Sequence, residues 1–352
     1  MKFIVDKFLI ISSLIFLCCL GYGVILYALP PEIMEKHFVT SVYSSSRYFW
    51  GTLSFISPIP LLYWWFFILL ICGIYLGYLR MRKNLGIKKL IQKVLAFILL
   101  HFSFFYLSWG FNYFKIPLRD RLDLNHDIAY FEFERELNEI TDELCNLRVE
   151  LNFENKNFTF LEIERELRIR VADVFNELFV FGNNRVRVRV LEPAGCLLVF
   201  GTAGIFWPFS GEGYVDSGLD SLVIPFTMAH EFAHGFGWTD EGECNFIALL
   251  ACRKSDKGLI RYSAELSYWR YLMSNAFRLS PELYKKYLSE ISIPIQMDLK
   301  SIDYHNNQFP EILPELRDWF YDRYLIFNGV KGGSQSYTGI IKWVINYRKR
   351  RL

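Results

Sequence analysis

Three long apolar stretches occupy the first third of the chain, and none of them contains a charged residue. Each has about the 20 residues that a helix needs to cross the roughly 30 Å hydrocarbon core of a bilayer. The pattern therefore predicts three transmembrane helices, over about 8–29, 61–79 and 94–114. Together they form a membrane anchor of residues 1–114.

The charges beside these helices indicate their orientation. Residues 80–93 (RMRKNLGIKKLIQK) contain six basic residues and no acidic one, and short basic loops stay on the cytoplasmic side of a membrane. The first apolar stretch exceeds the apolar core of a cleaved signal peptide, which is about 7–15 residues, so we expect it to remain as an anchor. Three crossings then place residues 115–352 outside the cytoplasmic membrane.

Beyond the anchor, the apolar periodicity is helical, then briefly strand-like, then helical again. Residues 127–150 and 159–181 have helical spacing, and the second segment begins with a Thr-x-x-Glu capping box. Residues 185–191 alternate Arg with Val, which is typical of a half-buried strand. A second strand is expected at 196–201, followed by a glycine-rich aromatic loop at 202–216. Further helices are expected near 259–278, 281–290, 310–326 and 336–349. The outer domain is therefore expected to be α+β and mainly helical.

Composition separates the two parts of the chain and excludes several protein classes. Residues 1–111 hold ten basic and three acidic side chains, whereas the remainder holds 29 and 34. A mean hydropathy of +0.18 and an aromatic content of 18% do not fit a disordered chain, a collagen or a coiled coil. The outer part is slightly acidic, so no nucleic-acid partner is expected. The seven cysteines include no C-x-x-C pair and indicate no metal framework.

One motif in the outer domain carries recognisable chemistry, the sequence H-E-F-A-H at residues 230–234. On a helix, residues four apart share a face, so His230 and His234 can direct imidazole nitrogens at one Zn²⁺. Glu231 then lies beside the metal and can take a proton from water. The alternative is an ordinary amphipathic helix that carries these residues by chance.

A catalytic zinc site needs a third protein ligand, and the acidic residues after the motif supply the candidates. Asp240 is expected to cap a helix that runs to about residue 251, and Glu243 then occupies the glutamate position of a capping box. Glu241 is freer to bind a metal and is favoured as the third ligand, with Glu243 as the alternate. Asn245 follows four residues after Glu241, where it can hydrogen-bond a ligand.

The motif and its flanks resemble a known group of proteins. Residues 230–234, followed by Glu241-x-x-x-Asn245, are similar to the gluzincin pattern of zinc metallopeptidases. Most of the chain, and residues 201–250 above all, resembles a bacterial family of uncharacterised multi-pass membrane proteins with a metallopeptidase domain of unknown substrate. The segments that carry the resemblance are Asn112-Tyr113…Pro117-Leu118, GIFWPFSGEGYVD and HEFAHGFGWTDEGECNF. The sequence departs from that family at Cys244 and at Phe209-Ser210, and neither position is expected to touch a ligand.

The resemblance implies a zincin-like domain in which His230, His234 and Glu241 bind zinc and Glu231 is the general base. It also implies that a strand near 198–206 holds an extended substrate by edge pairing.

Acyl-transfer chemistry further requires a donor that stabilises the developing oxyanion. Tyr337 is the first candidate, followed by His305 and Tyr262, although no spacing rule singles out any of the three.

The sequence therefore predicts a membrane-anchored, zinc-dependent peptidase that hydrolyses peptide bonds outside the cytoplasmic membrane. Its cofactor would be Zn²⁺, and its partners a peptide or protein substrate and the lipid bilayer. By the resemblance, the membrane is the bacterial inner membrane and residues 115–352 lie on its periplasmic side.

The alternative is a non-catalytic, zinc-binding scaffold or interaction protein of the envelope, which would close the site with a fourth protein ligand. A transporter is disfavoured because His101 is the only ionisable group deep in the predicted helices.

Overall fold

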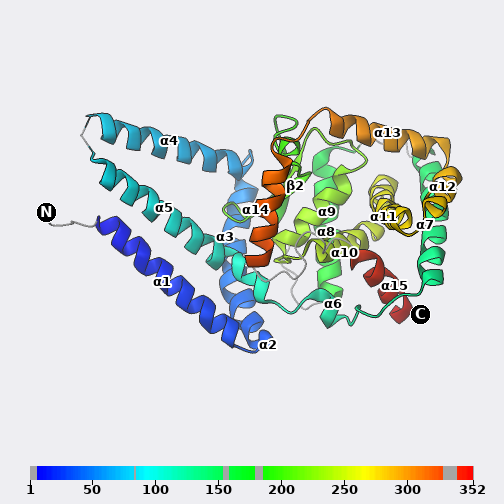
Figure 1. The fold of residues 1–352 in the computed structure, drawn as a ribbon, viewed down its shortest axis with the longest axis horizontal. Coiled ribbons are helices and arrows are strands. Elements are labelled where there is room, and N and C mark those ends of the chain that lie inside the picture. The colour runs from blue at the N-terminus through cyan, green and yellow to red at the C-terminus, as the bar shows by residue number, and fades with distance from the viewer. Residues whose placement is uncertain (1–5, 83–84, 154–157, 179–184, 328–338, 352) are drawn as a thin grey trace. The chain divides into compact units, whose positions relative to one another are not determined.

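The computed structural model is mainly helical, with a small three-stranded sheet among the residues that it describes (Figure 1). The described residues are 6–82, 85–153, 158–178, 185–327 and 339–351. The chain forms two compact units. The first contains residues 1–116 together with 207–212, and the second contains residues 117–206 and 213–352. The expectation of a mainly helical fold is confirmed.

Among its described residues, the first unit contains three helices that are long and apolar enough to cross a membrane, namely α1 (Lys7–Ala28), α4 (Leu61–Arg82) and α5 (Ile87–Ser108). The first two begin within one residue of the predicted starts. The three helices fit a membrane protein.

The predicted bounds of the third helix, 94–114, are wrong at both ends. Helix α5 begins at Ile87, so that Lys88 and Lys93 lie on its first turns, and the chain after Ser108 turns into the 3₁₀ helix η2 (Gly110–Phe114). The prediction was based on a stretch without charged residues, and such a stretch cannot include the lysines at the start of this helix. A helix end nevertheless tolerates them, because their long side chains can extend toward water.

The segment between the first two apolar helices is also helical. It forms α2 (Pro31–Met34), the π-helix η1 (Glu35–Tyr43) and α3 (Ser44–Ile56). The Glu35 carboxylate is buried and accepts a hydrogen bond from the backbone N–H of Ile116 at 2.9 Å. This segment contains many charged and polar residues, so the pattern of its apolar residues did not indicate a helix.

The expected loop at 202–216 is a β-hairpin made of β2 (Gly204–Trp207) and β3 (Glu212–Asp216). Its tip belongs to the first unit, where Trp207 packs edge-on against Trp65 with ring centroids 5.3 Å apart. The Glu212 carboxylate accepts hydrogen bonds from the backbone N–H of Leu61 at 2.8 Å and from the hydroxyl of Ser54. Glu212 therefore satisfies a backbone donor at the start of α4, where helix N–H groups lack intrahelical partners.

The second unit begins with helices that the sequence predicted well. Helix α7 (Tyr130–Phe153) and helix α8 (Phe160–Leu178) lie within a few residues of their expected bounds. The predicted capping box is confirmed, because Thr159 N–H donates to the Glu162 carboxylate at 2.8 Å and Glu162 N–H donates back to the Thr159 hydroxyl at 3.3 Å.

The predicted strand at 185–191 is also present, as β1 (Arg187–Leu191). Val186 and Val188 are buried against the core. On the other face of this segment, Arg187 lies 3.5 Å from the buried carboxylate of Glu164.

The predicted strand at 196–201 is wrong. This segment turns through the short 3₁₀ helix η3 (Leu198–Phe200). The buried carboxylate of Asp216 accepts backbone N–H groups from Gly195 and Leu197 at 2.7 and 2.6 Å, which holds the chain in a turn. The sheet order is β1-β3-β2, so β2 lies at an edge.

The remaining elements that the structure describes in the second unit are helices. Helix α10 (Glu241–Arg253) is buried along nearly its whole length and packs against α8, α15 (Gly339–Arg351) and the two helices that precede and follow it. The other helices are α6 (Leu118–Arg121), α9 (Ile224–Gly235), α11 (Gly258–Leu279), α12 (Pro281–Glu290), α13 (Ile293–Asn307) and α14 (Pro314–Phe327). Helix α13 was not predicted, although Ile295 and Ile302 bury one face of it.

Candidate metal centre

Helix α9 presents the H-E-F-A-H motif from a position fixed by close packing. Its second residue is Pro225, whose missing N–H costs nothing in a first turn. Its last residue, Gly235, lies against the residue that precedes β1, and a Cβ there would be 2.3 Å from a methyl carbon of Val186. Glycine at this position lets the end of the motif helix approach the sheet.

Helix α10 carries the third side chain of the cluster, next to the two histidines of the motif. Gly237, at φ +87°, allows the chain to turn after α9. The Asp240 carboxylate then accepts the N–H of Glu243 at 3.1 Å, so the predicted N-cap is confirmed. Glu241 becomes the first residue of the helix and reaches the histidines.

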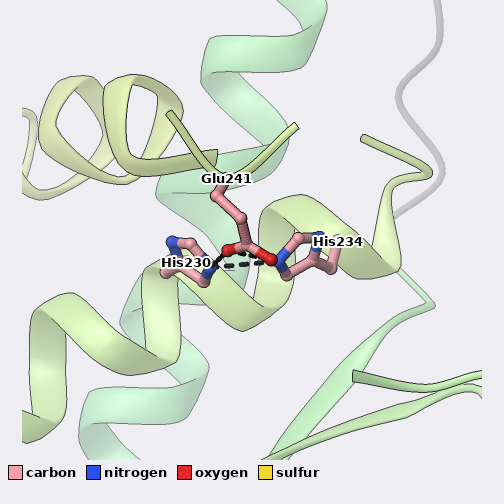
Figure 2. A group of neighbouring side chains, drawn as sticks. All are labelled: His230, His234 and Glu241. Atoms are coloured by element: carbon pink, nitrogen blue, oxygen red, sulfur yellow. Dashed lines mark hydrogen bonds and ion pairs between the residues drawn. The ribbon is translucent and has the colours of Figure 1, made fainter. Parts of the chain in front are cut away.

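His230, His234 and Glu241 converge on one point, with the carboxylate lying between the two imidazole rings (Figure 2). The Oε2 atom of Glu241 lies 3.0 Å from His230 Nε2 and 3.4 Å from His234 Nε2, and the two Nε2 atoms are 3.0 Å apart. Zinc with bonds of about 2.0–2.1 Å in a tetrahedral arrangement separates its ligand atoms by about 3.3 Å. The three ligand atoms therefore have nearly the spacing that a zinc ion requires.

The hydrogen bonds of the ring Nδ1 atoms establish which nitrogens are free for a metal. His230 Nδ1 lies 2.8 Å from Asn245 Oδ1, and His234 Nδ1 lies 2.8 Å from the backbone carbonyl of Trp238. Carbonyl oxygens only accept, so both Nδ1 atoms carry the proton and a neutral ring leaves Nε2 as a lone pair. When both rings are neutral, two lone pairs and a carboxylate face each other, an arrangement that a proton or a metal cation stabilises.

The pKa shifts of His234 and Glu241 also favour a positive charge at the centre of the cluster. Burial alone disfavours charge on His234, yet the neighbouring Glu241 carboxylate raises the pKa of His234 well above the usual histidine value. Burial also opposes the charged form of Glu241, yet the two histidines hold its pKa well below the usual carboxyl value. The site is built for positive charge at its centre, supplied by a proton or by a metal ion.

Glu231 lies next to this centre without belonging to the ligand group. Its side chain is 3% exposed, and its Oε2 has no hydrogen-bond partner among the described residues. Burial raises its pKa to about 7, although the nearby histidines oppose that rise. A buried carboxylate with an unused oxygen suits a group that exchanges a proton with a bound water, and the residues present fit a zinc site.

The structure places the remaining predicted residues as follows. Glu243 turns away from the histidines, and its carboxylate accepts hydrogen bonds from the backbone N–H and the guanidinium of Arg119 at 3.2 and 3.3 Å. The carboxylate of Glu243 thus binds Arg119 rather than closing the expected capping box. Asn245 contacts His230 as anticipated.

The candidate oxyanion donors do not gather at the cluster. Tyr262 donates its hydroxyl proton to Asp298 at 2.6 Å, and His305 lies 3.2 Å from Asp220. Tyr337 lies outside the described residues.

Cys244 requires a correction, because it does touch a candidate ligand. Its Sγ lies 3.4 Å from His234 Nδ1, on the side of the ring opposite to Glu241's contact with Nε2. Burial raises the pKa of its thiol to about 12, so the sulfur stays protonated. Sequence spacing alone did not reveal that residue 244 faces back toward α9.

Tyr271 of α11 is a neighbour of the site that the sequence did not indicate. Its hydroxyl accepts a hydrogen bond from the side-chain amide of Asn245 at 3.1 Å. No motif links residues 245 and 271, and only the packing of α10 on α11 brings them together.

Comparisons with known proteins assign the chain to a family but give no biochemical role. No curated protein and no solved structure gives a significant match. One family model, described as "Protein of unknown function (DUF3810)", matches residues 38–345, a span that includes α4, α5 and the whole histidine–glutamate cluster. The chain therefore belongs to the DUF3810 family.

Proposed function

We propose that this protein is a membrane-anchored, zinc-dependent peptidase. The observation that carries the proposal is the convergence of His230 Nε2, His234 Nε2 and Glu241 Oε2 beside the buried carboxylate of Glu231, whose Oε2 has no hydrogen-bond partner among the described residues. Three protein ligands with a neighbouring carboxylate are the donor set of catalytic zinc sites, which leave one position open.

His230, His234 and Glu241 would hold the metal. Zinc supplies Lewis acidity, which polarises a substrate carbonyl and makes water more acidic. Glu231 would accept the proton of the attacking water and pass it to the leaving amine nitrogen. Its raised pKa, about 7, suits a group that must both take and release a proton near neutral pH.

The edge strand β2 supports a role in substrate binding. It starts at Gly204, and a Cβ there would lie 2.6 Å from Oε1 of Glu231. An extended peptide paired to this edge would pass close to the general base. In this proposal the substrate-binding strand is β2, residues 204–207, which begins later than the residue 198 expected from the sequence.

Zinc content and peptide cleavage test the proposal together. Detergent-purified full-length protein would be analysed by elemental mass spectrometry beside His234→Ala and Glu231→Gln. Each form would then be incubated with a proteome-derived peptide library, and new termini would be identified by mass spectrometry. We expect about one zinc per chain in wild type and in Glu231→Gln, loss of zinc in His234→Ala, and cleavage by wild type alone.

Two results would overturn the proposal in different ways. A folded wild-type protein that takes up no zinc would make residues 230–234 an ordinary helix. Zinc without cleavage of any peptide, in wild type as in Glu231→Gln, would favour the non-catalytic scaffold.

We also propose that residues 117–352 act outside the cytoplasmic membrane, apart from the hairpin tip that joins the first unit. The proposal rests on the basic residues between α4 and α5, together with the three apolar helices. Fusion of alkaline phosphatase after Leu352 should give active enzyme, and fusion of a fluorescent protein that matures only in the cytoplasm should stay dark. The opposite pattern would reverse the orientation.

A further inference from the structure

The edge strand β2 has different surroundings at its two ends. Its first residue, Gly204, lies beside the proposed general base, because a Cβ there would be 2.6 Å from Oε1 of Glu231. Its last residue, Trp207, belongs to the first unit, which contains the candidate membrane helices. A strand rises about 3.3 Å per residue, so the two ends of β2 lie about 10 Å apart. One short strand therefore leads from Glu231 into the first unit.

Trp207 packs among aromatic rings of the first unit. Its ring centroid lies 5.3 Å from that of Trp65 and 5.4 Å from that of Phe209. The His101 ring completes the group, with its centroid 5.8 Å from that of Trp65 and 5.3 Å from that of Phe209. These four residues, the aromatic cluster, hold the end of β2 against α4 and α5.

The aromatic cluster lies near the start of α4 and the end of α5. Trp65 is the fifth residue of α4, about 6 Å along the axis from its start, and His101 lies about 10 Å before the end of α5. In two consecutive membrane-spanning helices, the start of the first and the end of the second emerge on the same side. Tryptophan is enriched at the membrane–water interface. The last residue of β2 would therefore lie close to the membrane surface.

This position restricts the kind of peptide that can bind along β2. With its scissile bond beside Glu231, an extended peptide would reach the level of Trp207 about three residues away. Residues beyond that point would meet lipid, where charged side chains and unpaired backbone groups are costly. An apolar segment that enters the bilayer as a helix meets this requirement. Attachment to the membrane also raises the effective concentration of such a substrate near the site.

We propose that the substrate is a polypeptide anchored in the same membrane, which the protein cleaves within about three to six residues of the apolar segment of the anchor. The inference rests on the peptidase of the proposed function and names its substrate class. The reaction is unchanged: the water oxygen bonds to the carbonyl carbon, the peptide C–N bond breaks, and Glu231 passes the proton to the leaving nitrogen. The length of β2 determines how far this bond lies from the bilayer.

The test compares three sets of synthetic peptides in phosphatidylcholine vesicles that contain the full-length protein. Directly anchored probes join a randomised segment to an apolar helix of about 20 residues. Spacer probes have a glycine–serine stretch of about ten residues between the two, which spans far more than β2. Soluble probes have the randomised segment alone. The helix precedes the segment in half of the anchored probes and follows it in the other half, because a peptide can pair with a strand in either direction.

We expect the directly anchored probes to be cleaved at least about tenfold faster than the soluble ones. Mass spectrometry should locate their cuts about three to six residues from the apolar helix. The spacer probes are equally confined to the membrane, so they are the matched control for effective concentration. The spacer should nevertheless reduce cleavage of the randomised segment several-fold, because it moves that segment away from the bilayer.

The outcomes separate this inference from the peptidase proposal. Equal rates for directly anchored and spacer probes, or cuts at no fixed distance from the apolar helix, would overturn the inference and leave the peptidase. Soluble probes cleaved as fast as anchored ones would do the same. No cleavage of any probe by wild type, as in Glu231→Gln, would remove the peptidase and this inference together.

A substitution in the aromatic cluster tests the structural cause. Trp65→Ala removes the ring of α4 that packs on Trp207, and every candidate zinc ligand stays in place. We expect it to keep about one zinc per chain, while its cuts in the directly anchored probes lose their fixed distance from the helix. The control is Trp64→Ala, whose ring is 48% exposed and packs on Phe67 instead. Wild-type cut positions in a folded Trp65→Ala would overturn the inference that the aromatic cluster sets the distance.

Discussion

Gly204 lies so close to Glu231 that a side chain at residue 204 and the carboxylate could not both keep their places. A Cβ at Gly204 would be 2.6 Å from Glu231 Oε1 and 2.8 Å from the backbone oxygen of Tyr214. Contacts below 3.0 Å require the carboxylate or the strand to shift. The edge strand and the proposed general base are thus fitted to each other.

Substitution Gly204→Ala should therefore impair catalysis more than metal binding. A displacement of about 1 Å in a catalytic group can cost about a hundredfold in rate, whereas the three zinc ligands do not contact this position. The measurement is zinc content together with the rate of peptide cleavage. The control is Gly86→Ala, where an added methyl meets no atom within 4 Å. A fully active Gly204→Ala would mean that Glu231 does not need its observed position.

The metal-free protein should become less stable as the pH rises from 5 to 8. Burial raises the pKa of Glu231 to about 7, above its unfolded value of about 4.5, so in this range the folded state binds more protons than the unfolded state. The pKa of His234 is also raised, and the stability that it contributes is likewise lost as the pH rises. Glu241 has a lowered pKa, so its contribution is lost only at more acidic pH.

This pH dependence is measured by chemical unfolding after treatment with a chelator. Glu231 alone should contribute on the order of 3 kcal/mol of destabilisation across the range. Glu231→Gln should remove that part of the slope, since an amide does not titrate. An unchanged slope in Glu231→Gln would contradict the assignment to this carboxyl group.

Removal of the Cys244 thiol should leave the metal in place. The sulfur lies on the Nδ1 side of His234, and a burial-raised thiol pKa of about 12 keeps it protonated, so it is not a fourth ligand. Cys244→Ala is expected to keep about one zinc per chain by elemental mass spectrometry, in contrast to His234→Ala. Loss of zinc from Cys244→Ala would instead indicate a closed structural site.

The Glu212 carboxylate should stabilise the membrane unit through the start of α4. Glu212→Ala leaves the Leu61 N–H and the Ser54 hydroxyl without this acceptor, at an expected cost of about 1–3 kcal/mol. Ser54→Ala removes only one of the two bonds and should cost less. Thermal unfolding in detergent measures both variants, and equal midpoints for the two would argue against the cap.

The sequence determined much of the candidate site because its determinants are local. Helical spacing places residues 230 and 234 on one face, and an N-cap at Asp240 starts the next helix so that Glu241 enters the cluster. The same local logic identified the apolar helices and the capping box of α8. The histidine pair and the two helix caps depend on residues within four positions of each other, and an isolated sequence contains that information.

Tertiary structure alone decided the features that depend on distant partners. The buried carboxylate of Asp216 turns residues 195–198 away from a strand, and a hairpin forms where glycine and aromatic residues suggested a loop. Cys244 reaches His234, and Tyr271 reaches Asn245, across helix interfaces. Each outcome rests on a contact between segments that only packing brings together, because the free energy of burying a polar group depends on the partner it meets.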